Sequence, residues 1–583
     1  MKKLNAVWLG LVAMLFLACE TENPNKLPLI IDQVQHNPGE AMTNTSFMDP
    51  EKLASFGYDG QVLTDYVFVQ TLITWDDFDK RIFPEGSEGR KWVEDKATAF
   101  DQRLKKAHKA GIKFLCQPDV LVFPKTLVEL YKDEICDDQG RVTFDKEKTW
   151  EIYRYMINAI FKRFPDLDGF VVRTGETYLT NIPYHTGNGP YKGSWKPGKK
   201  KNVLQTRLIN MFREELCEKR DKTLVYRTWG YLHSRPEEYL DVTDKVEPHE
   251  KLFFSIKHQN GDFHRGTPYN KTIGIGKHQQ IVEIQCQREY EGKGTHPNYI
   301  AKGVIEGFEE YGKSDYSPSS LKDLLNNPIF KGVWTWSRGG GWVGPYIENE
   351  IWPELNAYVL SAWANDTSRS EEEIFGEYMT KIGIHDEDSR KNFREMCLLS
   401  PKGVIRGHNS LVQNISPWWL RDQFMGGNRL VKELKKIHKE GNTEKVLAEK
   451  RECLAIWENI VSLSNKIKSD NEANDKFFKV SAVYGLIKYR IIAEGWTILL
   501  KGMEGDETGI YDKQAIAEAI RRYDQHWKDF AKLKEDNPDC PTIYTPYEFL
   551  YKKPHYQSGT KGMKFEVDRY RWTLEEDGNK VNV

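Results

Sequence analysis

The feature that most constrains the fold is a series of eight short apolar runs between residues 29 and 335. Several are separated by amphipathic segments typical of helices, among them residues 92–110, 150–164 and 203–219. Strands that alternate with helices pair in parallel, and eight of them predict a closed barrel. The runs are residues 29–31, 61–63, 113–116, 169–172, 223–226, 252–256, 282–285 and 332–335.

The pattern changes near residue 368, beyond which the chain has charged segments with apolar positions at helical spacing and no strand pattern. We therefore predict an α/β fold in which residues 27–367 form a (β/α)8 TIM barrel. Residues 368–583 are predicted to form an all-helical C-terminal region.

The N-terminus has the pattern of a targeting signal. Lys2 and Lys3 precede an apolar run over residues 4–18 that is too short to span a bilayer. The run ends in FLAC, which resembles a bacterial lipobox and predicts cleavage before Cys19 and lipidation of that residue. We expect a signal peptide over residues 1–18, a tether over 19–26 and an outer-membrane lipoprotein, periplasmic or at the cell surface. A plain signal peptide is the alternative.

The composition gives no sign of nucleic-acid binding or of a metal site. Lys and Arg total 84 and Asp and Glu total 86, so the net charge gives no reason to expect a nucleic-acid partner. The cysteines show neither a CxxC motif nor a Cys/His spacing typical of a metal site. We expect no metal, and the membrane is expected to be contacted through the N-terminal lipid alone.

Charged and aromatic residues follow the predicted strands, where the loops of a barrel build an active site. Glu176, Asp262 and Glu289 are the candidate catalytic carboxylates, because a pair of carboxylates flanking the scissile bond is what glycoside hydrolysis needs. Cations at the same strand ends suit an anionic substrate. The candidate substrate-binding residues are Arg173, Arg227, Trp229, Lys257, His258 and Arg338, and Asp119 is a possible fourth carboxylate.

Four segments, in order, resemble the α-glucuronidases of glycoside hydrolase family 67: residues 168–176 (DGFVVRTGE), 225–231 (VYRTWGY), 255–263 (SIKHQNGDF) and 283–292 (EIQCQREYEG). Residues 332–342 and 357–378 are similar to the family's last strand and the start of its helical region. The resemblance covers residues 165 to 380 approximately.

The resemblance implies roles for these residues. Glu176 matches the general acid of an inverting hydrolase, and Asp262 and Glu289 match its two base-side carboxylates. Arg227 and Lys257 match residues that hold the glucuronate carboxylate. The family has a third such residue, a lysine, and Arg173 stands one place closer to the acid than that lysine does. No metal or organic cofactor is implied.

Two features depart from the family. Glu176 is followed by Thr-Tyr-Leu instead of the family's Gly-Gln-Pro-Gly, and the barrel begins without room for the N-terminal family domain. The leading hypothesis is an exo-acting α-glucuronidase that removes glucuronic or 4-O-methylglucuronic acid from xylan-type oligosaccharides. The alternatives are a related barrel glycosidase on a different glycan and a non-catalytic glycan-binding lipoprotein.

Overall fold

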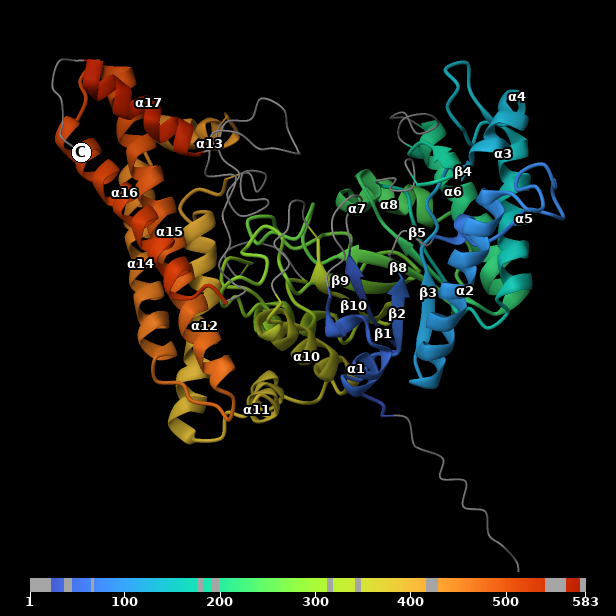
Figure 1. Cartoon of the computed structure of the whole chain (residues 1–583), viewed down its shortest axis with the longest axis horizontal. Coiled ribbons are helices and arrows are strands. Elements are labelled where there is room, and N and C mark those ends of the chain that lie inside the picture. Colours follow the sequence, from blue (N-terminus) through green and yellow to red (C-terminus); the bar gives the residue numbers. More distant parts are fainter. Residues whose placement is uncertain are drawn as a thin grey trace, which may run out of the picture.

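Eight parallel strands close into a barrel in the computed structural model (Figure 1). The structure describes residues 23–35, 44–63, 68–175, 182–190, 199–311, 318–340, 348–415, 428–539 and 563–576. Each of the eight apolar runs lies in one barrel strand, so the predicted fold class is confirmed. The strands are β1 (Leu29–Gln35), β2 (Gly60–Leu63), β3 (Lys113–Cys116), β5 (Gly169–Arg173), β7 (Thr223–Arg227), β8 (Leu252–Lys257), β9 (Gln279–Gln285) and β10 (Phe330–Gly339).

Helices fill most connections between these strands, but the connection from β8 to β9, residues 258–278, contains no helix although the structure describes all of it. This β8–β9 loop carries Asp262. A separate two-stranded sheet pairs β4 (Val122–Pro124) with β6 (His185–Gly187). The helices are α1 (Pro50–Ser55), α2 (Glu88–Lys109), α3 (Lys125–Leu130), α4 (Lys132–Ile135), α5 (Glu147–Arg163), α6 (Lys199–Phe212), α7 (Tyr231–Ser234), α8 (Pro236–Thr243), α9 (Ala301–Glu306) and α10 (Ile351–Asn365).

Glycine permits close strand approach in the barrel wall, as Gly169 and Gly332 show. A Cβ on Gly169 of β5 would lie 1.9 Å from the carbonyl oxygen of Thr223 on β7. A Cβ on Gly332 of β10 would lie at the same distance from the carbonyl oxygen of Leu29 on β1. Neither backbone could move away without breaking the ladder, so both positions require glycine.

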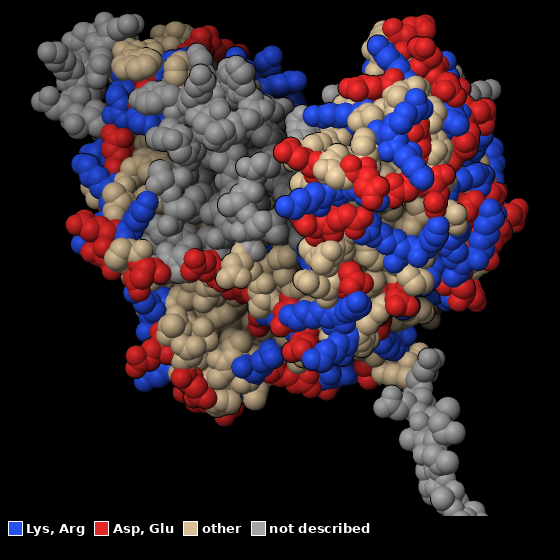
Figure 2. All heavy atoms as spheres, turned by 45° about the vertical axis from the view of Figure 1, so that its right-hand side comes forward, with Lys and Arg blue, Asp and Glu red and all other residues tan. Residues whose placement is uncertain are grey.

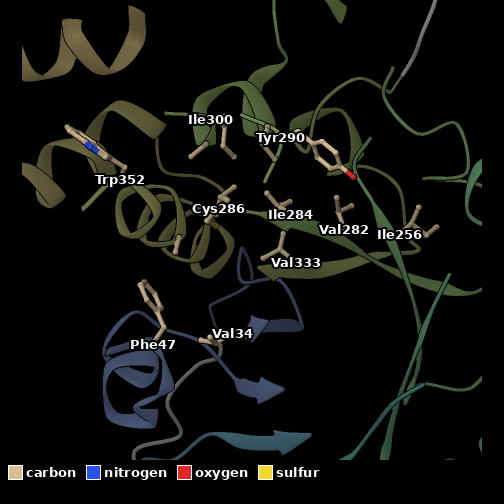
Figure 3. Close-up of a cluster of buried hydrophobic side chains, with 14 of the residues drawn as sticks. Val34, Phe47, Ile256, Val282, Ile284, Cys286, Tyr290, Ile300, Val333 and Trp352 are labelled. Atoms are coloured by element: carbon tan, nitrogen blue, oxygen red, sulfur yellow. The ribbon is translucent and has the colours of Figure 1, made fainter. Parts of the chain in front are cut away.

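Alternation along the strands divides the core into two layers. Val62, Leu115, Val171 and Trp334 belong to an inner cluster that fills the barrel. Residues of opposite parity form an outer layer, as Figure 3 shows for the β9 and β10 side chains near α10. The inner cluster is apolar, and the buried charged residues on the same faces, Arg173, Arg227, Lys257 and Glu283, lie toward the carboxyl ends of their strands.

The C-terminal region is helical throughout its described part, as predicted, and β10 is the last strand described. Helices α12, α14, α15 and α16 pack side by side beside the barrel (Figure 1). None of the described helices is long and apolar enough to cross a membrane. The helices are α11 (Glu371–Lys381), α12 (Glu387–His408), α13 (Asn428–Lys439), α14 (Thr443–Ser464), α15 (Glu472–Thr508), α16 (Lys513–Asp536) and α17 (Met563–Glu576).

Hydrogen bonds between buried groups join the barrel to the helical region. The indole of Trp352 in α10 donates to Ser481 Oγ in α15 over 3.3 Å. The backbone N–H of Tyr299, in the loop after β9, donates to Ser400 Oγ in α12 over 3.0 Å.

On the face shown in Figure 2 the Lys and Arg side chains are interspersed with Asp and Glu, without a field of one sign.

Candidate active site

The inward-facing positions of the strands turn from apolar to charged at the carboxyl end of the barrel. On β5, Val171 is followed two residues later by Arg173, and on β7 Val225 is followed by Arg227. Lys257 on β8 and Glu283 on β9 also occupy inward-facing positions near the carboxyl ends of their strands. All four charged side chains are buried. Because side chains two apart share one face of a strand, these charges meet inside one end of the barrel.

Arg227 is paired with Glu283, a carboxylate that we did not single out in the sequence. Arg227 Nε lies 3.0 and 2.9 Å from Oε1 and Oε2 of Glu283, and Nη2 lies 2.8 Å from Oε1. Ser255 Oγ also donates to Oε2, over 3.1 Å. The guanidinium lies 4.8 Å from the ring centroid of Trp336. The pairing differs from the expected pocket, in which Arg227 was to hold a substrate carboxylate with Lys257. The sequence feature that could have identified Glu283 is its position as a charged residue at an inward-facing position of an otherwise apolar strand.

Asp262 is held by donors on both carboxylate oxygens. Lys257 Nζ lies 2.7 Å from Oδ1, and the hydroxyl of Tyr290 donates to Oδ2 over 2.8 Å. The same ammonium lies 4.8 Å from the ring centroids of Trp229 and Phe263. Lys257 is buried, whereas the Asp262 side chain keeps 20% of its surface exposed. The carboxylate is therefore fixed in position and still reachable.

A cavity of about 590 Å³, called the first cavity below, opens beside Asp262. Three predicted site residues line it: Trp229, Lys257 and Asp262. Tyr231 and Tyr290, which we did not predict, add further aromatic wall. The remaining lining residues are Gly230, His233, Ser234, Asn260, Gly261 and Thr267.

Trp229 also packs on the segment that leads to the predicted acid. A Cβ on Gly175 would lie 2.5 Å from the Trp229 ring, so the indole lies directly against this glycine. Glu176 is the next residue and lies outside the described residues, as does Cys19. The structure thus fixes the chain up to the position before Glu176, and the predicted separation of Glu176 from the other carboxylates stays a prediction.

Glu289 follows β9 and is buried. Its backbone N–H donates to the side-chain oxygen of Gln285 over 2.5 Å. The preceding residue, Arg288, has a φ of +59° and binds Glu291, with Nε 2.9 Å from Oε2. Although burial opposes ionisation, the charge of Arg288 holds the pKa of Glu291 at about 2. This ion pair anchors the turn that presents Glu289.

Two further predicted residues make structural contacts at this end of the barrel. Arg338 is fully buried, and its Nε lies 3.1 Å from Oε1 of Glu350, just before α10. Arg173 Nη2 lies 3.9 Å from Oδ1 of Asp119, and both residues are buried. Each pair links the end of one strand to a neighbouring segment.

His258 is not among the residues that line the first cavity, and its role in substrate binding stays a prediction. It is buried, with Nδ1 3.4 Å from the backbone oxygen of Glu283. Burial, and next the charge of Arg288, lower its pKa to about 3. His233 does line the first cavity, and burial lowers its pKa to about 3 as well. Both imidazoles are neutral at physiological pH and are poor proton donors there.

The described residues contain no group of three or more His, Cys, Asp or Glu side chains that could hold a metal ion. The arrangement that they do contain is a fixed carboxylate at an aromatic-walled cavity, with buried ion pairs behind it. Such a site can bind a sugar and activate a water or attack a glycosidic carbon.

The fold can be compared with known proteins at this point. No protein-family model matches the sequence, and no curated protein matches it. A solved glycoside hydrolase family 138 enzyme targeting pectin rhamnogalacturonan II is similar with a TM-score of 0.57 and 11% identity, covering 95% of this chain and 84% of that one. An O-GlcNAc hydrolase from Thermobaculum terrenum gives a TM-score of 0.36 and 10% identity, over 95% and 94% of the two chains.

Identities this low establish the fold alone. The chain therefore has a closed eight-stranded parallel barrel similar to that of the family 138 structure, with a helical C-terminal region, and the family 67 resemblance stays a sequence-based prediction.

Proposed function

We propose that the protein is a glycoside hydrolase that removes an acidic sugar from a larger glycan. The observation that carries the proposal is Asp262, held by Lys257 and Tyr290 at the wall of the first cavity. A carboxylate that accepts from an ammonium and a phenol is stabilised as the anion, which is the form that a base requires. Trp229 and Tyr231 supply flat apolar surfaces on which a sugar ring can stack.

The proposed reaction gives each carboxylate the role that the family 67 resemblance implies. Glu176, two residues beyond Thr174 at the end of β5, would protonate the glycosidic oxygen as it leaves. Asp262, with Glu289, would remove a proton from the water that attacks the anomeric carbon on the opposite face. The anomeric configuration would then invert, as in hydrolases with a water between substrate and base.

The specific activity that we propose is removal of α-linked glucuronic or 4-O-methylglucuronic acid from xylan-type oligosaccharides. The family 67 resemblance supports an acidic sugar, whereas Lys257, the cation that lines the first cavity, is already paired with Asp262. A second candidate is a related hydrolase of another acidic glycan, such as a pectic one. Two observations favour it: Glu283 binds Arg227, and the similar family 138 structure is of an enzyme that targets pectin.

Product analysis tests both candidates. Purified protein is incubated with a panel of xylan-type and pectic oligosaccharides that carry uronic acids, and the released sugars are identified. NMR of the first product shows whether the anomer is inverted. Release of glucuronic acid from xylan-type substrates supports the first candidate, and release from pectic substrates alone supports the second.

Asp262→Asn separates an enzyme from a binding protein. General-base catalysis contributes about 10²–10⁴-fold, so kcat should fall by about that factor while substrate still binds. Asp101→Asn is the matched control, because Asp101 forms an exposed ion pair with Lys105 on α2 and does not line the first cavity. If wild type binds the panel without releasing any sugar, the protein is a glycan-binding lipoprotein instead.

We also propose the lipid anchor at Cys19, on the lipobox-like sequence alone. Cys19→Ala should move the protein from the membrane fraction to the soluble fraction of a bacterial lysate. An unchanged membrane fraction would contradict lipidation at this residue.

A further inference from the structure

A second cavity, of about 330 Å³, adjoins the first. It lies between the β8–β9 loop of the barrel and the C-terminal end of α12 in the helical region. Thr267 lines both cavities, so the two cavities meet at this residue. The β8–β9 loop therefore presents Asp262 to the first cavity and Thr267 and Pro268 to the second.

The barrel-side wall of the second cavity is rigid and electrically neutral. Arg265 is buried and binds Glu310 through two bonds of 2.8 Å, from Nε to Oε1 and from Nη2 to Oε2. Its Nη1 also donates to the carbonyl oxygen of Pro401 in α12. Tyr311 donates to the carbonyl oxygen of Thr267 over 3.2 Å. These contacts fix the loop against the helical region.

The wall on the helical side is equally well fixed. The buried ammonium of Lys450 donates to the carbonyl oxygens of Arg406 and Gly407 at the end of α12, over 2.6 and 3.1 Å. Glu449 accepts from the backbone N–H of Leu411 over 2.7 Å. Asn414 donates to the carbonyl oxygen of Gly266 and so ties this wall to the β8–β9 loop.

The lining suits an uncharged sugar. Tyr311, Pro268 and Leu411 offer apolar surface, while Thr267, Ser410 and Asn414 carry hydroxyl and amide groups. The charges of Arg265 and Glu310 neutralise each other. Carbohydrates combine apolar ring faces with hydroxyl groups, and a small number of polar groups in an otherwise apolar pocket gives them orientation.

We propose that the second cavity is a subsite for the neutral sugar chain that leaves when the acidic sugar in the first cavity is cut off. This inference rests on the proposed function. The position of Thr267 at the junction lets one branched oligosaccharide occupy both cavities. The helical region would thereby select the glycan backbone, a role that the sequence did not suggest for it.

Leu411→Trp tests the subsite, because Leu411 is half-buried and its enlargement fills the second cavity without reaching the first. The substrates are a xylo-oligosaccharide bearing one glucuronic acid and 4-nitrophenyl α-glucuronide, whose leaving group has no sugar chain. We expect kcat/KM on the oligosaccharide to fall about tenfold or more, and kcat/KM on the nitrophenyl substrate to stay within about twofold. Val412→Trp is the matched control: Val412 is the next residue, is 42% exposed and does not line the cavity.

Equal losses on both substrates, or none on either, would overturn the proposal. Leu411→Phe provides a milder filling if the Trp variant unfolds, and thermal melting checks the fold of each variant. Calorimetric titration with an unbranched xylo-oligosaccharide is independent of catalysis. Binding to wild type that is weakened in Leu411→Trp supports the subsite even if no glucuronide is hydrolysed, whereas absence of hydrolysis alone counts against the proposed function.

Discussion

Two ion pairs, one in the barrel and one in the helical region, differ in how far they are exposed to water. In the barrel, Arg227 and Glu283 are both almost fully buried and meet in the interior enclosed by the strands. In the helical region, a typical pair such as Lys501 on α15 and Glu444 on α14 joins at 2.7 Å with Glu444 68% exposed. Separating a buried pair leaves an unpaired charge in a dry interior, whereas water replaces the partner of an exposed charge. The buried pair is therefore a structural element of the barrel end, whereas an exposed pair such as Lys501–Glu444 adds little to the stability of the helices.

The largest effect is expected from Glu283→Gln. It leaves the Arg227 guanidinium buried without its carboxylate, which destabilises a protein by about 3–5 kcal/mol. Denaturant unfolding followed by circular dichroism measures the change. A loss below about 1 kcal/mol would show that water reaches this pair and would remove the contrast with the helical region.

The next effect concerns Asp32 of β1, which faces the outer layer and accepts hydrogen bonds from Thr335 and Ser337 of β10. Burial raises its pKa to about 7 despite these donors. The folded state thus holds a proton that the unfolded state releases near pH 4. Stability should fall as pH rises from about 4 to 7, by roughly 3–4 kcal/mol at about 1.4 kcal/mol per pKa unit.

Asp32→Asn should flatten this part of the stability profile, because the amide cannot ionise. Urea unfolding of wild type and variant at several pH values between 4 and 8 provides the measurement. Parallel profiles for the two proteins would mean that Asp32 does not titrate in this range.

Two glycines that pack on tryptophans, one at the barrel site and one in the helical region, allow an effect on activity to be distinguished from an effect on stability. A Cβ at Gly175 would lie 2.5 Å from the ring of Trp229 in the first cavity, and one at Gly485 in α15 would lie 2.2 Å from the ring of Trp457. Overpacking of this kind costs about 1–3 kcal/mol. Gly175→Ala should lower kcat/KM about tenfold, since it displaces Trp229 and the segment leading to Glu176, whereas Gly485→Ala should lower the melting temperature alone. Full activity in Gly175→Ala would contradict a positioning role for Trp229.

The smallest effect is expected from Glu444→Gln in the helical region. An exposed ion pair contributes about 0–1 kcal/mol, and salt screens it. The free energy of unfolding should change by less than about 1 kcal/mol, and the difference from wild type should shrink at high salt. A change as large as that of Glu283→Gln would refute the contrast between the two regions.

Some of the site was predictable because its signals are local. Lys257, Trp229 and Asp262 stand within six residues of the end of an apolar run, and a barrel must bring such residues to one end. His258 lies outside the lining of the first cavity because adjacent residues at a strand end face opposite sides, and Lys257 takes the inward side. Glu283 was missed because a single charge within an apolar run gives no sign of a partner; only closure of the barrel brings Arg227, 56 positions away in the chain, to meet it.

The sequence by itself determined the eight barrel strands and the helical character of the C-terminal region, since both depend on the spacing of apolar residues along short stretches. Tertiary structure alone decided that Arg227 binds Glu283, because these partners lie on different strands. It also decided that the helix-free β8–β9 loop contacts the end of α12. Gly266 and Asn414 are 148 positions apart in the chain, and only packing of the helical region against the barrel brings them together to enclose the second cavity.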